Sequence, residues 1–170
     1  MITEQTGIQD LFERLVAAED VGVKLELGQG TPTWEFLPSP MHQMKVRDID
    51  RSIRQAPDAS GCGCYTLADT YVLLPDGSLK RPDLMILCER PAPERHALRL
   101  VPKAVVEVLS PGFEAKDLDV GAPLYLSNGV LDVVVADPET GIVHHFRRGG
   151  SVKHAGPVEI RLEFGGVLTA

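Results

Sequence analysis

A chain of 170 residues, 44% of them hydrophobic, is long enough for one domain with a sizeable core. Its formal net charge of -7 argues against non-specific binding of nucleic acid through a broad basic surface. No apolar run is long enough to span a bilayer and no leader pattern opens the chain. We therefore expect a single cytoplasmic domain over residues 1–170, with no membrane partner.

The N-terminal part of the chain has the pattern of a helix, a β-hairpin and a second helix. Apolar residues recur every three or four positions from Ile8 to Val16, which gives a helix one apolar face. Alternating residues flank a glycine turn, as in a hairpin, and Ser39-Pro40 is typical of a helix start. The expected elements are a helix over residues 3–20, strands over 23–27 and 33–37, and a helix over 41–56.

From residue 57 onward, strands predominate. Turn signals such as Pro75-Asp76-Gly77 and Asn128-Gly129 separate runs of Val, Leu and Ile. The expected elements are strands over residues 64–74, 84–88, 101–109, 131–136, 142–146, 152–154 and 158–164, and a helix over 119–128. This order predicts an α/β fold with a mixed central sheet flanked by helices, preceded by the N-terminal helix and hairpin.

Two carboxylates occupy the most apolar pair of predicted strands. Side chains alternate along a strand, so Asp83 shares a face with Met85, and Glu107 shares a face with Val105. An ionised group inside such strands needs a partner or a metal. Because a short loop joins the strands, both carboxylates can reach one divalent cation. A carboxylate kept there for function rather than stability predicts that the fold tolerates Glu107→Leu.

The cysteines and the paired histidines have simpler interpretations. An odd count of three cysteines without a secretory signal suggests reduced thiols. Cys62-Gly-Cys64 has metal-ligand residue types but lacks a second pair at suitable spacing, which favours small, partly buried thiols over a zinc site. His144 and His145 are expected to be solvated at a strand end.

Five fragments in order resemble one known family. They are Glu26-Leu27, Ser39-Pro40-Met41-His42-Gln43, Arg81-Pro82-Asp83-Leu84, Val106-Glu107-Val108-Leu109-Ser110-Pro111, and Leu124-Tyr125 with Gly129-Val130 and Val134 to Pro138. Over roughly residues 20–147 the chain is similar to the Uma-type family of putative restriction endonucleases. This bacterial family belongs to the PD-(D/E)XK nuclease superfamily.

The resemblance implies a restriction-endonuclease-like core and Mg²⁺-dependent hydrolysis of DNA, with Mn²⁺ as a substitute cation. Asp83 and Glu107 match the metal ligands, and Glu26 matches a third acidic member of the site. His42 matches a residue at a helix start, where a substrate-binding role and simple capping or packing are equally open, and Lys45 is a second substrate-binding candidate. Structural alternatives for Asp83 and Glu107 are backbone hydrogen bonds and a salt bridge. The resemblance also implies a homodimer.

One departure from the family pattern concerns the catalytic lysine. The superfamily motif places it two residues after the second acid, where this chain has Leu109. The Uma-type family more often supplies it four residues before the tyrosine, where this chain has Gly121. Lys116 is the main replacement candidate, with Lys45 the weaker one, and Gly121→Lys is expected to fit. The alternative is a weak or inactive nuclease-fold protein that binds nucleic acid or another protein.

Overall fold

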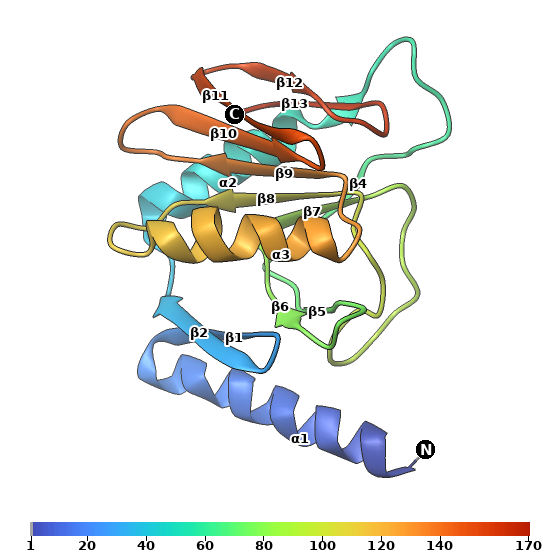
Figure 1. The fold of residues 1–170 in the computed structure, drawn as a ribbon, viewed down its shortest axis with the longest axis vertical. Coiled ribbons are helices and arrows are strands. Elements are labelled where there is room, and N and C mark those ends of the chain that lie inside the picture. Colours follow the sequence, from blue (N-terminus) through green and yellow to red (C-terminus); the bar gives the residue numbers. More distant parts are fainter. Residues whose placement is uncertain (1) are drawn as a thin grey trace.

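The computed structural model describes residues 2–170, without the side chains of residues 2–6 and 8. A six-stranded sheet forms the centre of the fold (Figure 1). Its strands are β4 (Tyr65–Ala68), β7 (Leu84–Leu87), β8 (Ala104–Val108), β9 (Asp132–Ala136), β10 (Ile142–Arg147) and β11 (Gly150–Ala155). They lie in the order β11-β10-β9-β8-β7-β4, with β8 parallel to β9 and the other neighbours antiparallel. The predicted mixed α/β fold is confirmed.

Helices cover both faces of the central sheet (Figure 1). As a result, the inner strands β7, β8 and β9 are buried on both sides. On one face, α2 (Pro40–Ser52) packs Val46 and Ile49 against Val106. A small sheet completes that layer, made of β3 (Arg54–Gln55), β12 (Glu159–Arg161) and β13 (Gly166–Thr169). On the other face, α3 (Ala122–Ser127) packs against Met85 and Val105. The predicted shared face of the two central strands is confirmed.

The N-terminal segment and residues 72–80 together form a second sheet beside the first. The N-terminal segment contains α1 (Ile2–Ala17), the 3-10 turn η1 (Ala18–Val21), β1 (Val23–Gly28) and β2 (Thr31–Phe36), and the later residues supply β5 (Val72–Leu73) and β6 (Leu79–Lys80). The strands lie in the order β2-β1-β6-β5. Gln29 and Gly30 both have positive φ in the hairpin turn, as a two-residue connection requires. On α1, Leu15 is buried and Val16 is 39% exposed, while the Ile8 side chain lies outside the described residues.

Several predicted boundaries are wrong; the strand expected over 158–164, for example, is reduced to β12. The strand expected over 64–74 divides near Asp69, whose positive φ turns the chain from the central sheet to the N-terminal one. The helix expected to reach residue 56 ends at Ser52, because Ile53 is extended and residues 54–55 pair with β13. Helical structure resumes at Glu114, within the expected loop, and continues as the π-helical segment η2 (Lys116–Gly121).

The expectation of reduced thiols is also wrong for two of the three cysteines. Cys62 and Cys88 are joined by a disulfide, and Cys64 is free. The Gly63 N–H donates to the Cys88 carbonyl at 2.8 Å, which holds the loop against the end of β7. The Cα atoms of Cys62 and Cys88 are 4.2 Å apart. The sequence spacing of Cys62 and Cys88 alone did not indicate that the two residues lie close together.

A buried aspartate ties β9 to the C-terminal sheet. Asp132 is fully buried and accepts hydrogen bonds from Arg147 Nε at 2.7 Å and the Glu163 N–H at 2.8 Å. His145 Nε2 lies 2.7 Å from the same carboxylate. This histidine is buried, whereas the sequence predicted that it would be solvated. Burial alone would raise the pKa of Asp132, but the hydrogen bonds from His145 and Arg147 lower it.

We predict that Asp132→Ala destabilises the fold by about 3 kcal/mol at pH 7, since it leaves buried donors without an acceptor. Because the folded pKa is lowered, this stabilisation is present above the unfolded pKa and is lost as the pH falls through the folded one. Urea unfolding of the wild type and the variant at several pH values, from neutral to below about pH 4, measures the loss of stability at pH 7 and its dependence on pH. Exposed Asp48→Ala on α2 is the control. Equal stability of the two variants at pH 7 would contradict the prediction.

Candidate functional site

The site is built on a reciprocal contact between β7 and β8. Asp83 lies directly before β7, and its backbone N–H donates to Glu107 Oε2 at 3.0 Å. In return, the Val108 N–H of β8 donates to Asp83 Oδ2 at 2.8 Å. Each carboxylate thus accepts a backbone hydrogen bond from the other strand, where the regular ladder ends. The arrangement fixes both carboxylates on the face that α3 covers.

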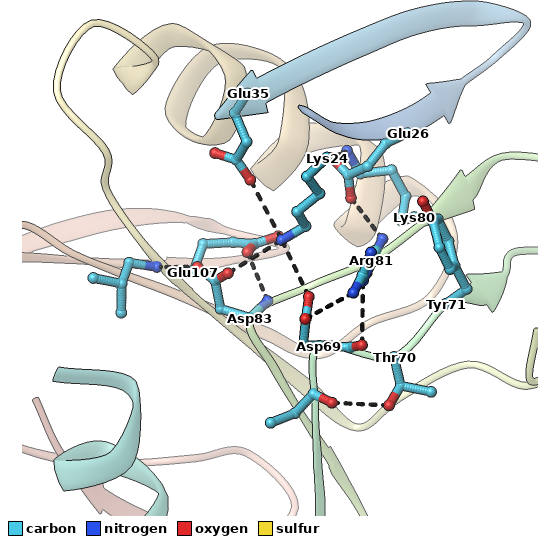
Figure 2. Close-up of polar contacts among 12 residues, drawn as sticks. Lys24, Glu26, Glu35, Asp69, Thr70, Tyr71, Lys80, Arg81, Asp83 and Glu107 are labelled. Carbon is cyan, nitrogen blue, oxygen red and sulfur yellow. Dashed lines mark hydrogen bonds and ion pairs between the residues drawn. The ribbon is translucent and has the colours of Figure 1, made fainter. Parts of the chain in front are cut away.

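Two basic side chains from other elements reach Asp83. Lys24 extends from β1 and places Nζ 3.2 Å from Asp83 Oδ1 (Figure 2). His42, in the first turn of α2, places Nε2 3.0 Å from Asp83 Oδ2. Burial would raise the pKa of Asp83, but the Lys24 ammonium and His42 hold it well below its usual range. Asp83 is therefore ionised at neutral pH.

Glu107 has the opposite electrostatic environment. It is 2% exposed, and its Oε1 accepts a hydrogen bond from the Tyr125 hydroxyl of α3 at 2.8 Å. Burial raises the pKa of Glu107 well above its ordinary value, and the nearby negative charges of Asp117 and Asp83 raise it further. The potential at Glu107 therefore favours an added positive charge, supplied by a proton or by a cation.

Glu26, on strand β1 of the hairpin, contacts Lys80 of β6, the backbone N–H of Arg81 and Lys116. Its Oε2 lies 2.6 Å from Lys80 Nζ, and its Oε1 accepts from the Arg81 N–H at 2.6 Å. Burial would raise the pKa of Glu26, but Lys80 and Lys116 lower it to about 2. Both oxygens thus already have strong donors. In the surrounding layer, the Arg81 guanidinium pairs with Asp69 at 2.8 Å (Figure 2).

Lys116 enters the site from the start of η2. Its Nζ lies 2.8 Å from Asp117 Oδ1, 3.3 Å from Glu35 Oε1 and 3.4 Å from Glu26 Oε2. Burial would lower the pKa of Lys116, but Glu26 and Asp117 raise it well above its ordinary value. Lys116 is therefore protonated at neutral pH.

Lys116 and Gly121 lie at the two ends of one π-helical turn. Gly121 follows Lys116 by five residues, the hydrogen-bonding step of a π-helix. A Cβ at Gly121 would lie 3.0 Å from the Lys116 carbonyl oxygen, although its φ of -66° is ordinary. The condition for Gly121→Lys, a φ that is not positive, is therefore met, but the Lys116 carbonyl would have to move by a few tenths of an ångström.

The structure brings most of the candidate residues from the sequence into one buried cluster. Asp83, Glu107, Glu26, His42 and Lys116 are members, whereas Lys45 of α2 takes no part in the described contacts of the cluster. The members that sequence reasoning missed are Lys24, Glu35, Lys80, Asp117 and Tyr125. One signal existed: the hairpin register pairs Lys24 with Glu35 directly across the strands.

The donor set at Asp83 and Glu107 fits a hard divalent cation. In the described part of the chain, His, Cys, Asp and Glu side chains do not gather in threes as a preformed metal cage. Mg²⁺ does not require one, because it binds through one or two carboxylates together with waters and substrate phosphate. The pKa of Glu107 is raised first by burial and then by the negative charges of Asp117 and Asp83, and a cation would offset these charges. The Lys24 ammonium forms an ion pair with Asp83 Oδ1 in this structure.

The geometry revises the expectation that Glu107→Leu is tolerated. Leucine would leave the Tyr125 hydroxyl and the Asp83 N–H without their acceptors, at about 1–3 kcal/mol for each buried donor. We predict that Glu107→Leu lowers the free energy of unfolding by several times more than Glu107→Gln, which keeps one acceptor oxygen. Denaturant unfolding of both variants measures the difference. Unchanged stability in Glu107→Leu would contradict this network.

Comparison with known proteins identifies the family and the fold of the chain. The profile of the Uma2 family, described as "Putative restriction endonuclease", matches residues 9–169. A solved structure, that of a putative nuclease belonging to DUF820 from Anabaena variabilis ATCC 29413, is similar in fold. Its TM-score is 0.61 at 17% identity, over 84% of this chain and 83% of that one. A search of curated proteins finds no match. In the described residues, no helix has the length and apolar character to cross a membrane. The chain belongs to the Uma2 family of putative restriction endonucleases.

Proposed function

We propose that this protein is a Mg²⁺-dependent endonuclease that hydrolyses phosphodiester bonds in DNA. The observation that supports the proposal is the Asp83–Glu107 pair, in which two carboxylates from neighbouring strands exchange backbone hydrogen bonds and share one face. Family membership supports a nucleic-acid substrate. Mn²⁺ is the expected substitute for Mg²⁺. The homodimer implied by the family resemblance stays a prediction.

Within this proposal, the lysines serve as electrostatic groups. Lys24 and Lys116 are both buried, and acidic neighbours raise the pKa of each above its ordinary value. Both therefore remain ammonium ions at neutral pH and stabilise negative charge on a phosphate that enters the site. In this protonated state each lysine acts as a positive charge rather than as a general base. Lys116 is the better candidate for contact with substrate, since Lys24 already pairs with Asp83.

Asp83 and Glu107 would hold the metal, and His42 would orient Asp83 through its hydrogen bond. A bound Mg²⁺ would supply Lewis-acid polarisation of the phosphate and a lowered pKa for an attacking water. Burial of the carboxylates strengthens both electrostatic effects, because the surrounding dielectric constant is low.

One observation supports a second candidate, an inactive nuclease-fold protein. The Lys24 ammonium lies 3.2 Å from Asp83 Oδ1 and 3.3 Å from Glu35 Oε1, so the carboxylates already have an internal counter-ion. A permanent ion pair at this position would leave a structural network without a metal. The two experiments below distinguish this candidate from the endonuclease.

We predict that Mg²⁺ or Mn²⁺ raises the melting temperature of the wild-type protein. Binding to the folded state alone contributes about 2.7 kcal/mol at a metal concentration 100-fold above Kd. For a chain of this length that corresponds to a rise of roughly 5–10 °C. Scanning calorimetry with metal and with EDTA measures the shift.

The matched variants for this measurement are Asp83→Asn and Asp48→Asn. Asp83→Asn should abolish the metal-dependent shift, whereas Asp48→Asn, at an exposed position on α2, should retain it. A wild-type protein without any shift would favour the inactive candidate. A shift that persists in Asp83→Asn would place the metal elsewhere.

We also predict Mg²⁺-dependent cleavage of DNA by the wild-type protein and its loss in Lys116→Ala. Loss of one transition-state charge contact lowers the rate by about 10²–10³-fold. Initial rates on circular single-stranded DNA and on supercoiled plasmid measure the effect. The exposed substitution Lys153→Ala on β11 is the control. Full activity in Lys116→Ala would exclude this lysine, and inactivity of a metal-bound wild-type protein would exclude the enzyme.

A further inference from the structure

An exposed cluster of three aromatic rings stands apart from the core. Trp34 is 49% exposed and Phe36 is 63% exposed, both on β2, and Phe113 lies in the loop before η2. The ring centroids are 5.6 Å apart for Trp34–Phe36, 5.4 Å for Trp34–Phe113 and 5.8 Å for Phe36–Phe113. The chain has only five Phe, three Tyr and one Trp, so a third of its aromatic residues gather at this surface.

This aromatic cluster adjoins the candidate site through both of its segments. Glu35 lies between Trp34 and Phe36 on β2, and its side chain turns the opposite way, to Lys24 and Lys116 (Figure 2 labels Glu35 and Lys24). Phe113 precedes Lys116 by three residues, and the Lys116 N–H donates to the Phe113 carbonyl at 3.0 Å. The rings and the charged cluster therefore share two segments of the chain, although the rings lie on the face of β2 opposite Glu35.

The charge of the protein favours a ligand that binds by more than phosphate contacts. Tight electrostatic binding of a duplex depends on many Lys and Arg contacts, and the net charge here is -7. Aromatic rings instead bind exposed base faces by stacking, which contributes substantially for each base and tolerates any sequence. The faces of paired bases inside a duplex are already stacked, so only unpaired bases can use such a surface.

We propose that Trp34, Phe36 and Phe113 form a stacking surface for unpaired bases, and that the strand bound at this site is single-stranded DNA. One or two bases rest on the rings while the adjoining phosphate lies towards Lys116. The proposal deepens the endonuclease function by naming the class of substrate. Because stacking requires no metal, binding can be measured separately from cleavage.

The single tryptophan makes a direct test available. Trp34 is the only source of tryptophan emission, so quenching reports contact at the aromatic cluster itself. With EDTA present, a short oligothymidine should quench Trp34 fluorescence in a saturable manner. A hairpin duplex should bind at least tenfold more weakly. Quenching that persists in a protein without Mg²⁺-dependent cleavage would support the stacking surface while excluding the nuclease.

Variants then connect the signal with the rings. Phe113→Ala should weaken oligothymidine binding by roughly tenfold, the scale of one lost base stack. Trp34→Ala should do the same when a labelled oligothymidine is followed by anisotropy, and Trp34→Phe should restore binding. Val152→Ala, an exposed apolar truncation on β11, is the control and should bind normally. Circular dichroism melting confirms that each variant is folded.

Three results would overturn the proposal. The first is the absence of quenching, and the second is equal affinity for duplex and single strand. The third concerns self-association, because Leu37 and Met41 are also exposed near the rings in the sequence. If Trp34 emission changed with protein concentration alone, and sedimentation showed a dimer that Trp34→Ala dissociates, the cluster would be an interface between two copies of this chain.

Discussion

The exchange of backbone hydrogen bonds between Asp83 and Glu107 organises the candidate site. At the end of the β7–β8 ladder, each carboxylate accepts an N–H from the opposite strand, at 3.0 Å for one and 2.8 Å for the other. Two acidic groups are thereby held at a fixed position inside an aliphatic sheet. Every other member of the cluster can be understood as a response to these buried charges, which are costly without partners.

Basic side chains from three separate parts of the chain offset this acidity. Lys24 comes from the hairpin, Lys80 from β6 and Lys116 from η2. Five buried carboxylates nevertheless face three ammonium groups and His42, and Glu107 retains a raised pKa. This balance leaves a structural role and a metal-binding role both consistent with the same residues. The aromatic cluster lies on the same two segments as Glu35 and Lys116, which belong to the charged cluster.

Regular patterns made much of this arrangement predictable. Alternation along two apolar strands placed Asp83 and Glu107 on one face, and turn chemistry predicted the hairpin that carries Glu26. Lys116 could be named only as a candidate, because a π-helical turn within an expected loop determines its position. Lys24 looked like an ordinary polar residue of a hairpin. Its burial arises from tertiary packing of the N-terminal sheet, which no local pattern encodes.

A crystal structure with Mn²⁺, with anomalous scattering recorded at the manganese edge, tests the central claim most directly. The account predicts one strong anomalous peak within coordination distance of both Asp83 and Glu107, with Lys24 Nζ displaced from its present 3.2 Å contact with Asp83 Oδ1. A structure at saturating Mn²⁺ without a peak between these carboxylates, and with the Lys24–Asp83 ion pair intact, would contradict it.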